Sequence, residues 1–223
     1  MKKRFLIGTV AAFALAYVAS ATAQSIMPVA TDSPAGAYAL DKAHASLTFR
    51  VSHMGFSNYT SRFTRLDAKL QLDPKNPSAS QVTATVDVRS LEPNAPPAGF
   101  LTQLLGKQFF EAAKYPKMIF RSTNVEMTAP NKARIIGDLT LHGITHPVVL
   151  ETTFNGGYAG FDLDPHARVG FSAHTTLKRS KFGMSFGLPP PGTTMGVGDD
   201  VDVAIECEFT GPAWKKPKAA PKP

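Results

Sequence analysis

The chain has 223 residues, of which 43% are hydrophobic, and it carries a formal net charge of +7 with a single cysteine. One cysteine excludes an internal disulfide framework. Three basic residues near the amino terminus and four lysines in the last nine residues account for the whole charge excess, so the neutral body between them lacks the field that attracts nucleic acid.

Residues 1–23 have the organisation of a secretory signal peptide. A basic start, Lys2-Lys3-Arg4, precedes an apolar stretch over residues 5–19, and Ala21-Thr22-Ala23 forms a small-residue cleavage site. The apolar stretch is shorter than the ~18 residues that a membrane-spanning helix needs. We therefore expect cleavage, export from the cytoplasm, and a flexible lead-in over residues 24–36.

Apolar and polar residues alternate along most of the remaining chain. Val82, Ala84, Val86 and Val88, for example, point to one face while the residues between them point to the other. This period of two predicts antiparallel strands with one apolar and one solvated face. The predicted strands cover residues 38–53, 62–72, 81–90, 117–127, 132–141, 147–154, 168–177 and 199–210.

The period changes between the third and fourth predicted strands. Leu101, Leu104, Leu105 and Ala112 recur at helical spacing, which predicts an amphipathic helix of about three turns over residues 100–113, ending before the next proline. A helix inserted between the strands of a barrel is expected to close one end of that barrel.

Eight antiparallel strands with one inserted helix predict a closed all-β barrel, because closure removes the exposed edges of long apolar strands. The barrel is expected to span residues 37–212, followed by a disordered tail of proline and lysine over residues 213–223. A barrel of eight strands is either filled by its own side chains or wide enough for one small ligand. A ligand carrier and a cavity-free interaction module therefore both stay open at this point.

Two patterns suggest catalytic or metal chemistry, and the surrounding sequence argues against both. Residues 183–187 match the G-x-S-x-G nucleophile motif, but the three prolines that follow exclude the helix that this motif requires. His142 and His146 are four residues apart, yet a glycine and a proline place them in a turn, where hydrogen-bonding roles are favoured over metal binding. We therefore predict no catalytic residue, metal or cofactor. A periplasmic enzyme that uses His53, His44 or the His142 and His146 pair is the weaker alternative.

Five stretches carry a family resemblance through their order and spacing: DKAHASLTF from residue 41, HMGFSN from residue 53, FFE and YPKMIFRS within residues 109–122, GDLTLHGITHPV from residue 137, and RSKFG from residue 179. Over residues 37–210 the chain resembles the YceI family of periplasmic, polyisoprenoid-binding, lipocalin-like proteins. The resemblance implies a barrel that holds a polyisoprenoid or another long-chain amphiphilic lipid for sequestration or transport, without catalysis.

The chain departs from the family pattern just before the predicted helix. The family has a polar segment of the Arg-Asp-x-His-Leu type there, whereas this chain has Pro96-Pro97-Ala98-Gly99-Phe100-Leu101. The mouth of the barrel is therefore expected to be more apolar, so that a neutral or weakly charged head group fits at least as well as a pyrophosphate.

The expected ligand contacts are inward-facing strand residues, the apolar face of the helix and a loop near residue 183. They are Phe49, Val51, His53, Phe63, Phe100, Leu101, Leu104, Leu105, Phe109, Phe120, Leu139, Phe171, Phe182 and Met184. Because His53 continues the parity of Phe49 and Val51 near a strand end, we expect it either to select the head group at the mouth or to form a structural hydrogen bond at the rim.

The partners follow from the same interpretation. We expect an isoprenoid or long-chain lipid as the ligand, and no nucleic acid. The basic tail either contacts an anionic membrane surface transiently or remains solvated. The sequence leaves open whether the protein is a monomer or a homodimer.

Overall fold

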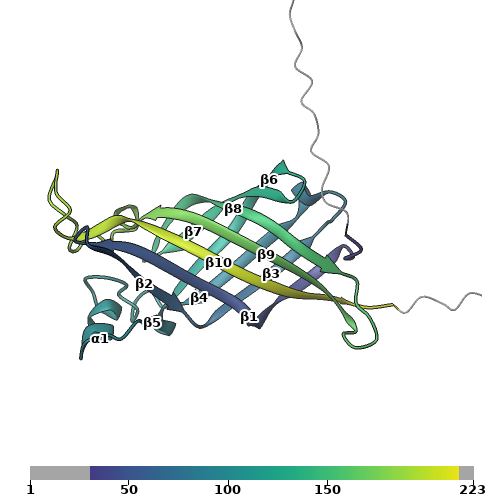
Figure 1. Ribbon diagram of the computed structural model, residues 1–223, viewed down its shortest axis with the longest axis horizontal. Helices are drawn as coiled ribbons and strands as arrows, with labels where there is room; N and C mark the ends of the chain where they lie inside the picture. Colours follow the sequence, from purple (N-terminus) through teal and green to yellow (C-terminus); the bar gives the residue numbers. More distant parts are fainter. Residues whose placement is uncertain (1–30, 216–223) are drawn as a thin grey trace, which may run out of the picture.

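The computed structural model describes residues 31–215. It is a long antiparallel barrel whose strands cross its axis at a steep tilt (Figure 1). The strands are β1 (Gly36–His53), β2 (Ser57–Phe63), β3 (Leu66–Leu72), β4 (Gln81–Asp87), β5 (Leu91–Pro93), β6 (Lys117–Ala129), β7 (Lys132–Leu141), β8 (Ile144–Tyr158), β9 (His166–Lys178) and β10 (Val197–Ala213).

Pairing between the first and last strands closes the barrel. β1 pairs with β10 from Ala39 opposite Thr210 to His53 opposite Val197. The ring then runs through β9, β8, β7, β6, β4 and β3 back to β1, which makes eight strands. This confirms the predicted eight-stranded antiparallel barrel.

The two remaining strands extend the ring at one end. β2 pairs with the second half of β1, whereas β3 pairs with its first four residues. β2 and β3 therefore lie one after the other along the same side of β1. β5 pairs with β2 and follows β4 after the short 3-10 helix η2 (Val88–Ser90). The predicted second strand, residues 62–72, is therefore two strands in the structure: its first two residues end β2, and residues 66–72 form β3. The start of β2 at Ser57 is not apparent in the sequence because its inward hydroxyl side chains hide the apolar pattern.

The helix is shorter than predicted. α1 (Phe100–Leu105) has six residues, not three turns, and the chain leaves it at Gly106 with extended dihedral angles of φ −81° and ψ −179°. Residues beyond Gly106 fold back onto it, and the N–H of Ala112 donates to the Leu105 carbonyl. Glycine is a poor helix residue, so the apolar spacing that continues through residue 112 does not extend the helix.

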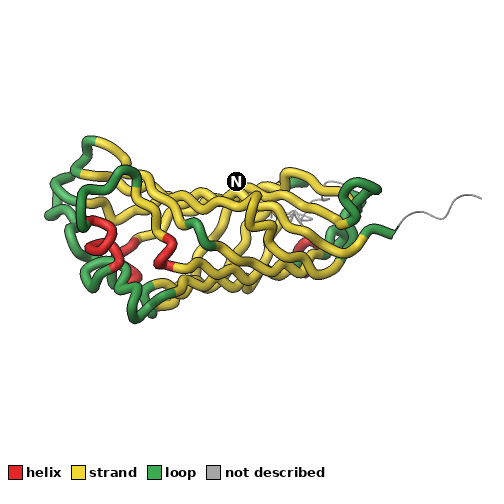
Figure 2. Tube along the Cα trace, turned by 90° about the horizontal axis from the view of Figure 1, so that it is seen from below, coloured by secondary structure: helices red, strands yellow, loops and turns green. Residues whose placement is uncertain are grey.

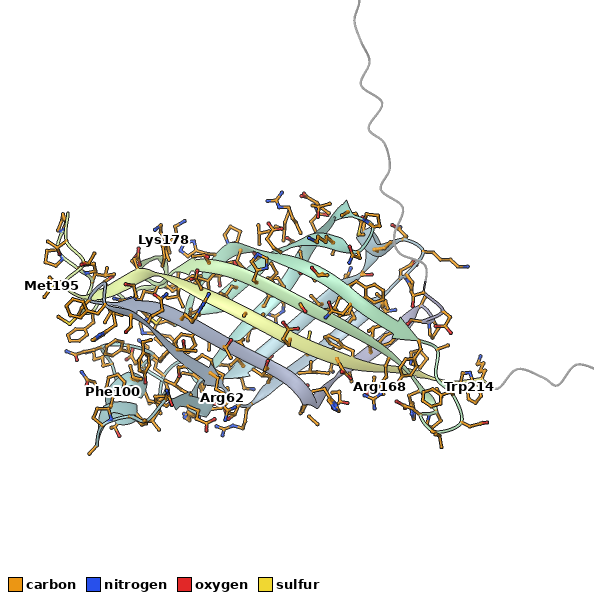
Figure 3. All side chains as sticks on the ribbon, in the orientation of Figure 1. Arg62, Phe100, Arg168, Lys178, Met195 and Trp214 are labelled. Carbon is orange, nitrogen blue, oxygen red and sulfur yellow. The ribbon has the colours of Figure 1, made fainter. Side chains whose placement is uncertain are left out.

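The loops lie at the two ends of the barrel, and the two ends differ (Figures 2 and 3). The end that carries α1, the turn at residues 54–56 and the loop at residues 183–196 is called the helix end. It includes the labelled Phe100 and Met195, whereas Trp214 marks the opposite end (Figure 3). Two further 3-10 helices, η1 (Pro77–Ala79) and η3 (Arg179–Phe182), lie beside the barrel strands. Within residues 31–215, no helix is long and apolar enough to cross a membrane.

Buried hydrophobic side chains within residues 31–215 form three clusters, one near the opposite end and two at the helix end. Near the opposite end, Tyr38, Leu70 and Phe209 belong to a cluster at the ends of β1, β3 and β10. At the helix end, two smaller clusters close the wall. Their buried members are Phe63, Val86 and Leu91, and Leu141, Phe182 and Met184.

The predicted terminal segments are only partly covered by the structure. The signal peptide lies outside the described residues, as do most of the lead-in and most of the basic tail.

Candidate ligand-binding cavity

A cavity of about 550 Å³ occupies the helix end of the barrel. Its size falls within the range of small-molecule sites. Most of the predicted contact residues line it, namely Phe49, Val51, His53, Phe63, Phe100, Leu104, Phe109, Phe120, Leu139 and Met184. The barrel is therefore not filled by its own side chains, and the cavity-free alternative does not describe it.

A second cavity of about 210 Å³ lies farther along the barrel, toward the opposite end. Phe171, which was expected in the same site as Phe49, lines this second cavity instead. The loops at residues 73–80 and 130–132 contribute its outer rim. The strand parity that identified the first set of residues also places Leu70, Val82 and Phe154 inward, but the sequence carries no signal that divides the interior in two.

Six residues line both cavities and mark the boundary between them, which is called the waist. They come from β1, β4, β6, β8 and β10, and are Leu47, Ala84, Val86, Phe120, Leu150 and Ile205. All six are apolar, so the boundary offers no polar group to a ligand that crosses it.

Three predicted contact residues line neither cavity. Leu101 points away and is 37% exposed. Leu105 packs against the cluster of Phe63, Val86 and Leu91. Phe182 is buried in the wall with Leu141 and Met184. Because α1 makes fewer than two turns, only part of its apolar face can reach the lumen.

Few polar side chains reach the larger cavity, and Arg179, the one cation among them, already uses four of its five hydrogen-bond donors. The polar lining residues are His53, Ser57, Tyr59, Thr175 and Arg179. The Arg179 guanidinium is buried and donates to four backbone carbonyls, those of Met184, Phe186, Val197 and Gly198, at 2.7–2.9 Å. Burial lowers the pKa of Arg179 from its ordinary value. Two of these bonds reach the loop at residues 183–196 and two reach the start of β10, so Arg179 holds the loop against the end of the barrel.

The histidines do not form a catalytic group within the described residues. His142 Nδ1 lies 3.0 Å from the Phe182 carbonyl and His146 Nε2 lies 2.9 Å from the Lys181 carbonyl, which are structural contacts to η3. His53 lines the larger cavity at its mouth, and it is the one histidine on either cavity's lining. No pair of histidines therefore meets beside a cavity, as the enzyme alternative would require.

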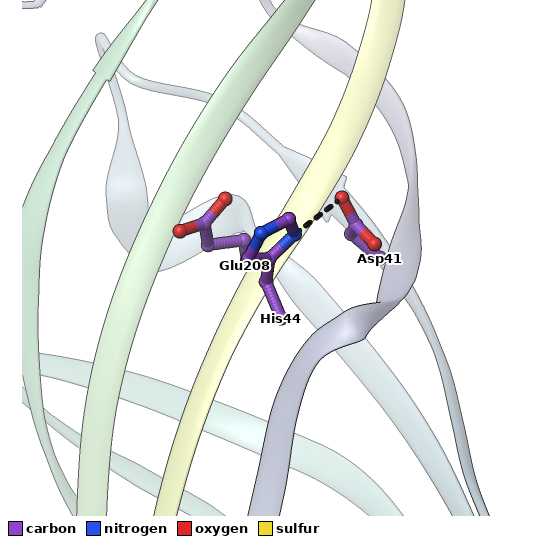
Figure 4. Close-up of side chains that lie close together, drawn as sticks. All are labelled: Asp41, His44 and Glu208. Atoms are coloured by element: carbon purple, nitrogen blue, oxygen red, sulfur yellow. Dashed lines mark hydrogen bonds and ion pairs between the residues drawn. The ribbon is translucent and has the colours of Figure 1, made fainter.

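Asp41, His44 and Glu208 form the group of side chains that most resembles a metal site (Figure 4). Their ligand atoms lie within 4.8 Å of one another. Arg168 already supplies a cation, because its Nη1 lies 2.6 Å from Asp41 Oδ2 and 3.9 Å from Glu208 Oε2. Hydrogen bonds from Arg168 and then from His44 lower the pKa of Asp41 to about 2. We therefore describe this group as an ion-pair network between β1, β9 and β10.

The single cysteine lines the smaller cavity. Cys207 lies on β10, and burial raises the pKa of its thiol to about 12. A thiol with this pKa stays protonated at ordinary pH and is therefore a poor nucleophile.

Comparison with known proteins places these observations in one family. The sequence model of the YceI-like domain matches residues 38–209. A UPF0312 protein of Vibrio cholerae serotype O1 is 34% identical over 186 residues, covering 82% of this chain and 92% of the relative. A UPF0312 protein of Pseudomonas syringae pv. tomato is 36% identical over 171 residues, covering 76% and 84%.

Solved structures share the barrel. A Campylobacter jejuni YceI protein is 29% identical with a TM-score of 0.60, covering 78% of this chain and 96% of that one. BcnA of Burkholderia cenocepacia shares the fold at 23% identity and a TM-score of 0.64, covering 76% and 98%. A polyisoprenoid-binding domain of Saccharophagus degradans shares it at 15% identity and 0.54, covering 78% and 98%.

Proposed function

Because the chain belongs to the YceI-like domain family, we propose that it is a periplasmic binding protein that holds a polyisoprenoid or another long-chain amphiphilic lipid inside the barrel for sequestration or transport. The observation that carries the proposal is the cavity of about 550 Å³ inside a closed barrel, lined mainly by aliphatic and aromatic side chains. The Saccharophagus degradans domain that shares the fold is described as polyisoprenoid-binding, which supports the same class of ligand.

The size and lining of the cavity suit an apolar chain. If each carbon group takes up about 30 Å³, as a water molecule does, the larger cavity accommodates about 18 carbon groups. Because an isoprene unit has five carbons, this corresponds to between three and four isoprene units. Burial of one five-carbon unit contributes about 4 kcal/mol before the costs of ordering are subtracted. Burial of the chain alone can therefore supply most of the affinity.

The helix end has the features expected of an entrance for lipid. Phe56 is 81% exposed and Met195 is 56% exposed. They lie on neighbouring segments, because the Met54 N–H donates to the Gly196 carbonyl at 2.7 Å. Residues 94–110 and 183–198 contain no acidic side chain. This acid-free apolar rim supports exchange of lipid at the helix end.

The periplasmic location is part of the proposal and depends on the leader-like segment at residues 1–23. The tail that begins at residue 213 carries four lysines and supports a transient contact with an anionic membrane, at about 1 kcal/mol for each lysine near the surface. Most of the tail lies outside the described residues.

Native mass spectrometry tests the proposed function. The protein is purified from cells, its mass is measured before and after delipidation, and the delipidated protein is titrated with isoprenoids of increasing length. We expect a co-purified apolar ligand and saturable uptake of one chain per barrel. A barrel that is reproducibly empty and takes up no isoprenoid would exclude the proposal.

A further inference from the structure

The hydroxyl group of Tyr59 is buried next to the larger cavity and has no hydrogen-bond partner among residues 31–215. The Tyr59 side chain lines that cavity, and its Oη is inaccessible to solvent. Burial of a hydroxyl group without a partner is unfavourable, and a ligand oxygen that reaches the hydroxyl on binding would remove that cost.

Other tyrosines in the barrel have partners for their hydroxyl groups. Tyr38 donates to the Pro34 carbonyl at 2.7 Å, and Tyr158 donates to Asp164 Oδ2 at 2.7 Å. The Tyr59 ring, in contrast, makes an edge-to-face contact with the ring of Phe100 in α1, with the ring centroids 6.2 Å apart and the ring planes at 85°. The short helix therefore fixes the Tyr59 ring over the lumen without satisfying its hydroxyl group.

Neighbouring polar side chains form a small patch on the same inward surface. His53 is directly opposite Ser57 in the pairing of β1 with β2, and Val51 is directly opposite Tyr59. His53, Ser57 and Tyr59 all line the larger cavity. This patch lies at the helix end, whereas the waist on the other side of the cavity is wholly apolar.

The patch has little capacity to neutralise an anion. No lysine, aspartate or glutamate is found among the residues that line the larger cavity. Arg179 is the strongest cation there, but four backbone carbonyls already accept hydrogen bonds from its guanidinium. A diphosphate at this position would carry more negative charge than the single Arg179 guanidinium can balance, and only one N–H of that guanidinium is left to bind it, so its burial is unfavourable.

We propose that the Tyr59 hydroxyl donates a hydrogen bond to an oxygen atom of a neutral lipid head group, an alcohol or a carbonyl, and that the site selects such heads over diphosphates. This inference rests on the proposed function and adds the class of head group and the orientation of the ligand. The head lies under α1 beside Tyr59, and the apolar chain runs toward the waist.

The test compares three isoprenoids of equal chain length on the full-length delipidated protein: a hydrocarbon, the corresponding alcohol and the corresponding diphosphate. The wild-type protein is expected to bind the alcohol most tightly. Tyr59→Phe keeps the ring contact with Phe100 and removes only the hydroxyl group. We expect it to weaken binding of the alcohol about fivefold to tenfold and to leave binding of the hydrocarbon unchanged.

Tyr38→Phe is the matched control, because that hydroxyl has a backbone partner and Tyr38 lines neither cavity. It should preserve the ratio of alcohol to hydrocarbon affinity. As a direct readout, an isoprenoid ketone should show a carbonyl stretch shifted to lower frequency in the wild-type complex, and the shift should be lost in Tyr59→Phe.

The outcomes separate this inference from the proposed function. If the wild-type protein binds the hydrocarbon and the alcohol but Tyr59→Phe changes neither their ratio nor the carbonyl stretch, the role of Tyr59 is wrong while lipid binding stands. If the diphosphate binds most tightly, the selection for neutral heads is wrong. If no isoprenoid binds, the proposed function itself fails.

Discussion

Ala84 of β4 and Phe120 of β6 are direct cross-strand partners, and both line the two cavities. The ring of Phe120 lies against Gly137 of β7, where an added Cβ would come within 2.5 Å of the ring. A glycine on one neighbouring strand and an alanine on the other thus accommodate one phenylalanine at the waist. We expect the size of these side chains to limit how far a bound lipid chain can extend.

Ala84→Leu is expected to limit the length of the bound chain. The larger side chain extends into the boundary between the cavities, so an isoprenoid of five units should bind at least tenfold more weakly, while one of three units should bind as before. Titration with the two lengths measures the effect. Thr83→Leu, at an exposed position one residue earlier, is the control. Equal losses for both lengths would show that the waist does not discriminate by length.

Leu104 and Leu101 are expected to differ although they lie on the same short helix. Leu104 lines the larger cavity, whereas Leu101 is 37% exposed and does not. Leu104→Ser should weaken lipid binding about tenfold, because a buried leucine contributes about 1.5–3 kcal/mol. Leu101→Ser should have little effect in the same titration. A larger loss for Leu101→Ser would mean that α1 presents its other face to the lipid.

Arg179→Met is expected to destabilise the protein by about 3 kcal/mol. The substitution leaves four carbonyl groups without their charged donor at the base of the loop at residues 183–196. Urea denaturation measures the loss. Arg62→Met removes an exposed ion pair with Glu92, which solvent screens, and should cost much less than Arg179→Met. Similar costs for the two variants would contradict the structural role of Arg179.

Asp41 is expected to contribute to the acid sensitivity of the fold. Its pKa in the folded protein is about 2, below its ordinary value of 3.8, because Arg168 and His44 hydrogen-bond to its ionised form. The stabilisation, about 1–2 kcal/mol, is present above about pH 4 and is lost as the pH falls toward 2. Asp41→Asn should therefore be less stable than wild type at neutral pH and lose less stability between about pH 4 and pH 2.

Asp67→Asn provides the control for this pH series, because Asp67 is an exposed carboxylate whose ion pair with Lys42 is long, at 3.9 Å. It should follow the wild-type curve. Thermal or urea unfolding across the pH range checks both variants, and parallel curves for Asp41→Asn and wild type would contradict the network around Arg168.

Several features of the fold could be predicted from the sequence because they depend on local periodicity. Val82, Ala84 and Val86 alternate with polar residues, so their inward direction follows from strand geometry alone. The same reasoning placed Phe49, Val51 and His53 on one inward face, and the structure brings all three to the larger cavity. Eight such segments without a parallel crossover leave a closed barrel as the arrangement that protects their edges.

The length of the helix could not be predicted in this way. Apolar residues continue at helical spacing through Ala112, but the backbone leaves the helix at Gly106 and folds back through a hydrogen bond to Leu105. Apolar residues at helical spacing are compatible with a helix, but a chain that turns back after one short helix can bury the same side chains. Leu105 is consequently in the wall rather than at the cavity.

The sequence by itself therefore determined the barrel and the apolar character of its interior, because strand alternation is a property of neighbouring residues. Only the tertiary structure decided that the interior is divided at Ala84 and Phe120, and that the Tyr59 hydroxyl is buried next to the cavity with no partner in the described part of the chain. Both features arise from side chains that are distant in the chain and meet only after β1 and β10 close the ring. Their packing depends on size and position across strands, which no local pattern encodes.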